Sequence, residues 1–230
     1  MKKSVVVISL GGSLIIPEKM KVSVLERFKH VLRKHYKSYK FVVVCGGGAL
    51  ARKYISVMKS EKRSHRDVSL AGILTTRTNA EFMMQFFGKK EANDFLPKDM
   101  NEVRDDLKKN NVVFCGALRY TAKSTSDSTA AKLALKLKTP FINITNIKGL
   151  YTANPLTHKA AKFIPKISWN AFDARANKRK YKSGQHFVLD QKAATIVHRH
   201  KITTYIVGPD MRNLDRILSG RKFTGTLIKG

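Results

Sequence analysis

The stretch TSDSTAAKLALKLKTPFINITNIKGLYTANP, residues 125–155, decides the fold of this chain. It opens with four polar residues whose side-chain oxygens can cap a helix. Small and apolar residues then recur at helical spacing as far as Pro140, and the apolar run Phe141–Ile144 has the pattern of a short buried strand. A polar loop containing Gly149 follows. This order predicts an open α/β sheet, in which ligands bind beyond the carboxyl ends of the strands.

Two other strand-like runs also end in glycines. Ser4–Leu10 is followed by Gly11-Gly12-Ser13, and Phe41–Val44 leads through Cys45 into Gly46-Gly47-Gly48. Glycines at such positions let backbone N–H groups approach an anion, and a helix that starts directly afterwards adds the positive end of its dipole. Two such loops after neighbouring strands predict that two phosphate-bearing ligands meet at one edge. This pattern favours phosphoryl transfer over simple binding.

The rest of the chain continues the alternation of helices and strands. We expect further helices over residues 22–35, 49–55, 67–87, 186–200 and 214–218, a short helix within 91–110, and further strands over residues 112–115, 203–207 and 223–228. Residues 157–183 are polar and strongly basic, with Trp169 and Phe172 as isolated apolar anchors. We find no internal repeat and no low-complexity linker.

The chain is unusually basic. Its 45 Lys and Arg against 16 Asp and Glu give a formal charge of +29, a field that attracts nucleotides, RNA or acidic membranes. The positive residues are spread along the whole sequence, which favours a general enrichment in lysine over a dedicated RNA surface. The densest cluster, Lys178–Lys182, is interpreted as a solvated loop. An apolar content of 43% excludes a disordered chain.

Several other classes of protein are disfavoured. Cys45 and Cys115 stand alone in apolar surroundings, which suits a reducing cytoplasm rather than a disulfide framework. Gly11 and Gly12 interrupt the apolar amino-terminal run, so we do not expect a signal peptide. No segment has the length of apolar sequence that a membrane helix needs. The seven histidines form no ligand pattern, and no structural metal is expected.

Taken together, the motifs resemble the amino-acid kinase family, and within it the uridylate kinases of archaeal type. The resemblance covers essentially the whole chain. It rests on six short segments in the family's order: Gly11–Ser13, Cys45–Arg52, Thr75–Ala80, Thr125–Ser128, Thr145–Pro155 and Val188–Ala194. Each segment by itself is weak evidence for the family, whereas all six in the family's order are specific for it.

The resemblance implies a fold and a reaction. The fold is a single domain, 1–230, built as a three-layer α/β/α sandwich with a mainly parallel central sheet. The acceptor would bind to the first half, approximately 1–139, and ATP to the second half, approximately 140–230. The implied reaction moves the γ-phosphoryl group of ATP, carried with Mg²⁺, to UMP to give UDP. The implied assembly is a homohexamer.

The resemblance also assigns residues. Gly11 and Gly12 would cradle the transferring group, and Asp127 would organise the reacting groups, although a helix cap is the simpler interpretation of an Asp there. The acceptor residues would be Gly46, Gly47, Gly48, Arg52, Asp67, Ser69, Thr125 and Ser126. The ATP residues would be Ser13, Thr145, Asn146, Gly149, Tyr151, Asn154, Pro155 and Asp190.

Three positions depart from the family's pattern. Ser9 stands where many members have a catalytic Lys, Ser69 where an acid contacts the acceptor ribose, and Lys148 where an acid precedes a glycine. Two alternatives therefore stay open. One is another phosphate-acceptor kinase such as an isopentenyl phosphate kinase, which uses a His near the acceptor phosphate; the nearest His here, His65, is in a polar turn. The other is a degenerate relative that binds nucleotide or RNA without turnover.

Overall fold

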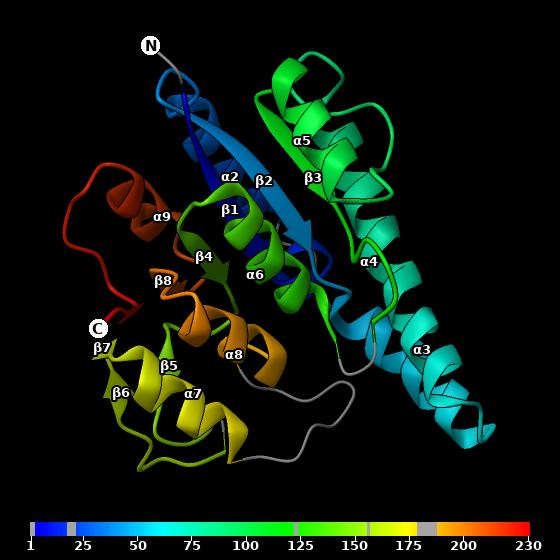
Figure 1. The fold of residues 1–230 in the computed structure, drawn as a ribbon, viewed down its shortest axis with the longest axis vertical. Coiled ribbons are helices and arrows are strands. Elements are labelled where there is room, and N and C mark those ends of the chain that lie inside the picture. The colour runs from blue at the N-terminus through cyan, green and yellow to red at the C-terminus, as the bar shows by residue number, and fades with distance from the viewer. Residues whose placement is uncertain (1–2, 18–21, 122–123, 156, 179–187) are drawn as a thin grey trace.

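The computed structural model describes residues 3–17, 22–121, 124–155, 157–178 and 188–230 (Figure 1). Within these residues seven strands form one sheet in the order β3-β2-β1-β4-β8-β9-β7, and β5 pairs with β6 in a separate two-stranded ribbon. The strands are β1 (Ser4–Leu10), β2 (Tyr39–Cys45), β3 (Val112–Cys115), β4 (Phe141–Ile144), β5 (Leu150–Tyr151), β6 (Phe163–Ile164), β7 (Lys166–Ile167), β8 (Thr204–Val207) and β9 (Thr226–Ile228).

The helices fall between the strands, and all but α1 and α7 overlap helices that the sequence predicts. They are α1 (Gly12–Ile15), α2 (Val22–Lys34), α3 (Gly48–Ser60), α4 (His65–Phe87), α5 (Met100–Lys109), α6 (Ser126–Leu137), α7 (Trp169–Asn177), α8 (Gln191–Arg199) and α9 (Met211–Leu218). Parallel strands need a crossover connection, and the helices supply it. Within the seven-stranded sheet, neighbouring strands are parallel except β8 and β9, which confirms the mainly parallel sheet.

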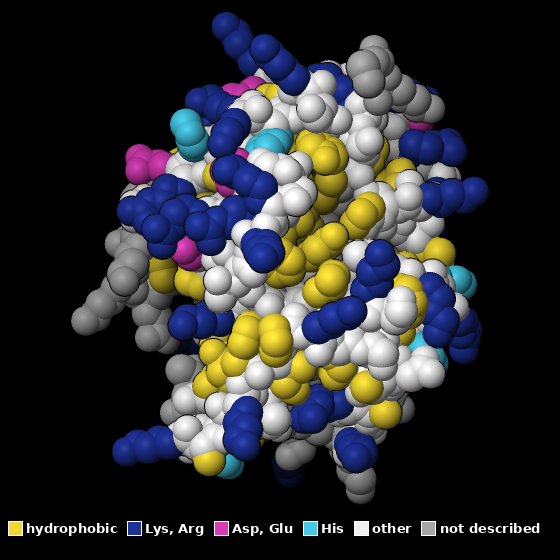
Figure 2. All heavy atoms as spheres, turned by 90° about the vertical axis from the view of Figure 1, so that its left-hand side faces the viewer, with side chains coloured by type: hydrophobic (Ala, Val, Ile, Leu, Met, Phe, Trp, Pro, Cys, Tyr) yellow, Lys and Arg dark blue, Asp and Glu magenta, His cyan; other side chains and the backbone are white. Residues whose placement is uncertain are grey.

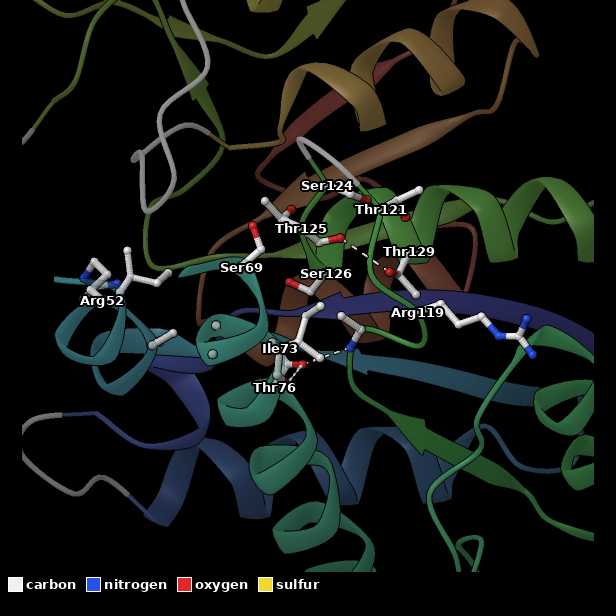
Figure 3. A pocket seen from close by; sticks show the side chains of 16 residues that line it. Arg52, Ser69, Ile73, Thr76, Arg119, Thr121, Ser124, Thr125, Ser126 and Thr129 are labelled. Carbon is white, nitrogen blue, oxygen red and sulfur yellow. Dashed lines mark hydrogen bonds between the residues drawn. The ribbon is translucent and has the colours of Figure 1, made fainter. Parts of the chain in front are cut away.

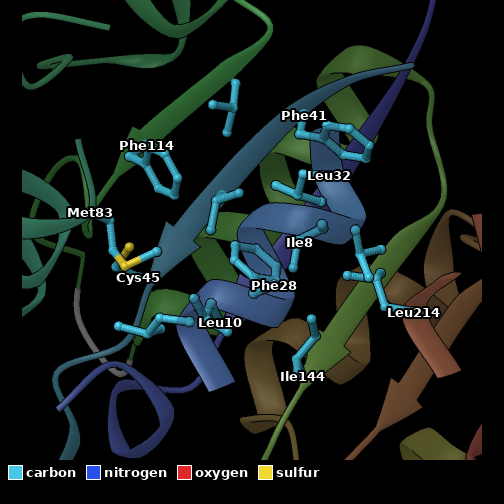
Figure 4. Packing of buried hydrophobic residues seen from close by; sticks show 14 of the residues in the cluster. Ile8, Leu10, Phe28, Leu32, Phe41, Cys45, Met83, Phe114, Ile144 and Leu214 are labelled. Atoms are coloured by element: carbon cyan, nitrogen blue, oxygen red, sulfur yellow. The ribbon is translucent and has the colours of Figure 1, made fainter. Parts of the chain in front are cut away.

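The two faces of the sheet bury separate cores because successive side chains of a strand point to opposite sides. Ile8 and Leu10 of β1 pack on one face with α1, α2, α9 and the carboxyl-terminal half of α4 (Figure 4). Val7 packs on the other face with α5, α6, α7 and α8. Phe28 and Phe114 are fully buried in the first core, where a large side chain contributes about 1.5–3 kcal/mol. The three-layer sandwich is thus confirmed.

Helix α4 serves two parts of the molecule. Its carboxyl-terminal half carries the buried Met83 and Phe87 under the sheet. Its amino-terminal half pairs with α3, and the two helices extend together beyond the sheet as a hairpin (Figure 1). Gly72 faces Ile55 across this hairpin, where an added Cβ would lie 3.2 Å from the Ile55 side chain. The hairpin forms one wall of the site described below.

The basic segment 157–183 contains more structure than its composition predicts. Ser168 caps α7 by accepting from the N–H of Ala171, and the supposed isolated anchors belong to this helix. Trp169 donates to the carbonyl of Ile202, and Phe172 is fully buried. Lys178 ends the helix, and residues 179–182 of the basic cluster lie outside the described part of the chain.

The surface reflects the composition. Figure 2 shows Lys and Arg side chains scattered over one face, with few acids among them and a hydrophobic stripe between them. In the described part of the chain, no helix combines the length and apolar character needed to cross a membrane. The same residues contain no group of three His, Cys, Asp or Glu side chains arranged to hold a metal ion.

Candidate functional site

The adjacent strands β1, β2 and β4 end at the same edge of the sheet, and a polar loop follows each of them there. Strand β1 lies between β2 and β4, and backbone hydrogen bonds continue past the strand ends. The N–H of Gly11 donates to the carbonyl of Ile144 at 2.9 Å, and the N–H of Gly46 donates to the carbonyl of Leu10 at 2.9 Å. The loops after β1, β2 and β4 therefore share one edge of the sheet, as expected for a ligand site in an open α/β fold.

The two glycine loops touch each other. A Cβ added to Gly12 would lie 2.4 Å from the carbonyl oxygen of Gly46 and 2.3 Å from the backbone nitrogen of Gly48. Gly48 itself has a φ of +65°, a conformation that costs little only for glycine. Asn79 of α4 fixes the second loop by donating its side-chain N–H to the Gly46 carbonyl at 2.6 Å. The close approach requires glycine on both sides.

A cavity of about 230 Å³ opens at this junction. It is lined by Ser9, Gly11, Gly12, Ser13, Gly46, Gly47, Gly48, Arg52, Thr125, Ser126, Asp127, Asn143, Ile144, Thr145, Asn146, Val188 and Asp190. We call it the transfer cavity. The helices α3, α6 and α8 all begin beside it, so their amino-terminal dipole ends favour an anion there.

Asp127 is not the helix cap. Thr125 takes that role in α6: its side chain accepts from the N–H of Asp127, and the Ser128 hydroxyl accepts from the N–H of Thr125. The Asp127 carboxylate instead accepts a hydrogen bond of 2.8 Å from the Ser9 hydroxyl. The simpler interpretation of Asp127 as a cap is therefore wrong, and its carboxylate is directed into the transfer cavity.

A second carboxylate lies close to Asp127. Asp190 caps α8 by accepting from the N–H of Ala193 at 2.7 Å, and its other oxygen accepts from the Thr125 hydroxyl. Burial, with a further contribution from the charge of Asp190, raises the pKa of Asp127 to about 7, against the opposing hydrogen bond from Ser9. Ser9 is neutral and supplies no positive charge to offset these effects.

A second cavity, of about 190 Å³, adjoins the first (Figure 3). We call it the acceptor cavity. Its lining residues are Gly47, Gly48, Ala51, Arg52, Ile55, Ser69, Gly72, Ile73, Thr76, Ala117, Arg119, Thr121, Ser124, Thr125, Ser126 and Thr129. Five of these, Gly47, Gly48, Arg52, Thr125 and Ser126, also line the transfer cavity. The two spaces therefore share a wall.

Arg52 stands at the shared wall. It is half-buried in the first turns of α3, and among the described residues its guanidinium has no hydrogen-bond or ion-pair partner. Arg119, the other charged residue of the acceptor cavity, is paired with Asp99 at 3.2 Å. The unengaged guanidinium is suited to an anion held between the two cavities.

Most of the predicted site residues meet here, and some do not. Asp67 lines neither cavity, because its carboxylate accepts from the Ser64 hydroxyl at 2.6 Å at the start of α4. Gly149, Tyr151, Asn154 and Pro155 also line neither cavity. They belong to the loop around β5, where the Tyr151 ring packs against Phe163 with centroids 5.4 Å apart.

Sequence reasoning missed several lining residues. Asn143 is a polar residue within the buried strand β4, only 4% exposed, and donates to the carbonyl of Val188. An amide in an otherwise apolar strand was the available signal. Thr121, Ser124 and Thr129 line the acceptor cavity from the loop before α6 and from its first turns. No local pattern distinguishes these hydroxyls from ordinary surface residues.

Comparison with known proteins agrees with this geometry. The model of the amino acid kinase family matches residues 4–208. The uridylate kinase of Thermococcus kodakarensis is 30% identical over 226 residues, covering 97% of this chain and 99% of that protein. The uridylate kinase of Archaeoglobus fulgidus is 32% identical over 224 residues, with the same coverage.

Solved structures show the same similarity. The crystal structure of the Archaeoglobus fulgidus uridylate kinase superimposes with a TM-score of 0.82 at 31% identity, covering 97% of this chain and 99% of that one. The UMP kinase of Bacillus anthracis reaches a TM-score of 0.80 at 18% identity and shares the fold. The match of the family model over most of the chain, together with full-length relatives, shows that the chain belongs to the amino acid kinase family.

Proposed function

We propose that this chain is a uridylate kinase that transfers the γ-phosphoryl group of ATP to UMP, giving UDP and ADP. The observation that carries the proposal is the shared wall of the two cavities, which contains Arg52, Gly47 and Gly48, with Gly11 and Gly12 on the adjoining wall of the transfer cavity. Full-length similarity to uridylate kinases supports the choice of UMP as acceptor.

The chemistry needs little covalent participation by the protein. An oxygen of the UMP phosphate attacks the γ-phosphorus of ATP, the bond from that phosphorus to the β,γ-bridging oxygen breaks, and ADP leaves. The attacking oxygen is already ionised near neutral pH, so no strong general base is required. The protein must hold two anions in line and stabilise the charge on the transferring group.

We assign the acceptor phosphate to Gly46, Gly47, Gly48 and Arg52, with Thr125 and Ser126 beside the nucleoside. The transferring group lies against Gly11 and Gly12. Backbone N–H groups at both glycine loops and the dipole of α3 provide fixed donors, and Arg52 provides the mobile positive charge. The close contact of Gly12 with Gly46 keeps the donor and acceptor loops at one fixed separation.

On the ATP side we assign Ser13, Thr145, Asn146 and Asp190 to the phosphates. Gly149, Tyr151, Asn154 and Pro155 are assigned to the nucleoside end, outside the two cavities. Asp127, Asp190, Asn143 and Asn146 present oxygen donors to the transfer cavity, a set that fits Mg²⁺. When bound with ATP, Mg²⁺ would neutralise part of the phosphate charge. Asp127 holds its place through Ser9 and organises the reacting groups.

The proposed setting is the cytoplasm, because Cys45 and Cys115 are buried free thiols in the described structure. We propose a homo-oligomer, a hexamer by resemblance. The exposed apolar side chains of the α3–α4 hairpin, including Val57 at 60% and Leu74 at 59%, support an interface there. Light scattering that gives the 25.9 kDa of one chain would contradict the oligomer.

The test is a phosphotransfer assay of the purified chain with Mg²⁺-ATP against UMP, CMP, AMP, GMP and isopentenyl phosphate. Turnover of UMP at more than about 100 times the kcat/KM of each other acceptor is the expected result. Preference for isopentenyl phosphate would assign the chain to a different kinase class. Binding of ATP without any turnover would identify a nucleotide-binding relative.

A further inference from the structure

The acceptor cavity contains no carboxylate among its described lining residues. The polar groups of its wall are the hydroxyls of Ser and Thr residues and the two arginines. Residues 122–123, which follow Thr121 and lie outside the described part, are Ala and Lys, so they add no acid. This composition matters because a carboxylate is well suited to accept a hydrogen bond from a ribose hydroxyl, as it does in dinucleotide-binding folds.

Ser69 occupies the middle of this wall. Figure 3 shows it between Arg52 at one end and Thr129 at the other, with its hydroxyl directed into the same space as that of Ser126. The Ser69 hydroxyl donates its proton to the carbonyl of His65 at 2.8 Å within α4. Because its proton is already engaged, the Ser69 hydroxyl can offer a ligand in the cavity only a neutral oxygen acceptor.

The nearest acid in the sequence does not replace it. Asp67 is half-buried on the first turn of α4, and its carboxylate accepts a hydrogen bond of 2.6 Å from the Ser64 hydroxyl. A helical residue two positions away points to a different side of the helix, since successive residues turn by about 100°. Asp67 is therefore outside the acceptor cavity.

Two other hydroxyls of the wall, those of Thr76 and Thr125, are also engaged in hydrogen bonds. Thr76 donates to the carbonyl of Ile73 at 2.7 Å and accepts from the N–H of Ala117 at 2.9 Å. Thr125 donates to the carboxylate of Asp190. These groups stabilise the wall itself and have little hydrogen-bonding capacity left for a nucleotide.

We propose that the acceptor cavity does not distinguish ribose from 2′-deoxyribose, so the enzyme phosphorylates dUMP about as well as UMP, with Ser69 as the position that sets this tolerance. The inference rests on the proposed function. A site built to bind a substrate hydroxyl rejects the analogue lacking it by about 10⁴-fold or more, because its own buried groups are left unpaired. A neutral, partly used hydroxyl such as Ser69 gives a difference of about tenfold or less.

The experiment compares UMP and dUMP on the wild-type chain with Mg²⁺-ATP, and measures the Kd of each nucleotide by calorimetry without ATP. We expect ratios below about tenfold for both kcat/KM and Kd. A larger preference for UMP in the Kd values overturns the inference, whether or not the enzyme turns over. Absence of turnover with both nucleotides overturns the proposed function instead, and the Kd values still test the cavity.

Substitution at Ser69 tests the position. Ser69→Asp places a carboxylate in the cavity and should raise the UMP-to-dUMP ratio at least tenfold, and Ser69→Asn, which keeps the site neutral, should raise it less. Asp67→Asn is the matched control, because it changes the acid outside the cavity and should leave the ratio unchanged. Circular dichroism confirms that each variant is folded. If Ser69→Asp is folded and binds UMP with an unchanged ratio, Ser69 does not set the tolerance.

Discussion

The Ser9 hydroxyl donates a hydrogen bond of 2.8 Å to the carboxylate of Asp127, although 118 residues separate them in the chain. Ser9 is near the end of strand β1, which lies between β2 and β4, and Asp127 is in the first turn of α6. The bond fixes the helix that carries Asp127 against the strand that leads into Gly11. In this chain a neutral donor, the Ser9 hydroxyl, therefore holds the carboxylate.

Asp127→Asn should retain the fold and lose at least about 100-fold in kcat. The amide keeps the size of the side chain and can still accept from Ser9, but it removes the charge that organises the reacting groups. Phosphotransfer from Mg²⁺-ATP to UMP measures the effect. Asp94→Asn, which changes an exposed acid paired with Lys89 away from both cavities, is the control. An unchanged kcat in Asp127→Asn would show that the charge of Asp127 is not needed for phosphotransfer.

Asp127 should also make stability depend on pH. Its pKa is about 7 in the folded chain and near 3.8 when unfolded, so between these values the folded state binds one more proton. The free energy of unfolding should therefore fall as pH rises from about 4 to about 7, relative to Asp127→Asn. We expect a relative loss on the order of 4 kcal/mol by pH 8, measured by urea unfolding of both proteins without nucleotide. A pH-independent difference between them would contradict the raised pKa.

Arg52→Ala should raise the KM for UMP by about 10- to 100-fold and change the KM for ATP less. The guanidinium has no described protein partner, so its removal costs a charge-assisted contact with the acceptor phosphate and leaves the fold intact. Lys53→Ala, the next residue along α3 and outside both cavities, is the matched control. An equal rise in the KM for UMP and the KM for ATP would show that Arg52 does not contact the acceptor phosphate selectively.

Gly12→Ala should separate the two glycine loops. The added Cβ would lie 2.4 Å from the Gly46 carbonyl oxygen and 2.3 Å from the Gly48 backbone nitrogen. Since both of these atoms belong to the backbone, one loop must move. A displacement of about 1 Å between donor and acceptor costs on the order of 100-fold in rate. Gly220→Ala, where an added Cβ would meet nothing within 4 Å and which lines neither cavity, is the control and should affect kcat far less. Full activity in Gly12→Ala would show that the loops can separate without consequence.

The sequence by itself determined the elements and the chemistry at the strand ends. Strands 112–115 and 141–144 have the bounds that their apolar runs predict, and the loops at Gly11 and Gly46 follow adjacent strands. These features are local, because a buried parallel strand needs a continuous apolar run and a close backbone approach needs glycine. The same local rules missed α7. This helix is stabilised by tertiary contacts, since it packs on α8 and its Trp169 donates a hydrogen bond to the carbonyl of Ile202.

Only the tertiary structure decided which side chains act together. Asp127 and Asp190 look alike in sequence, as acids at helix starts, yet Asp190 caps its helix and Asp127 reaches Ser9 in another element. Asp67 and Ser69 are two residues apart, and only Ser69 lines the acceptor cavity. Such differences depend on how helices are placed against the sheet over distances of more than 100 residues. Propensity and spacing describe a residue's near neighbours along the chain and carry no information about those contacts.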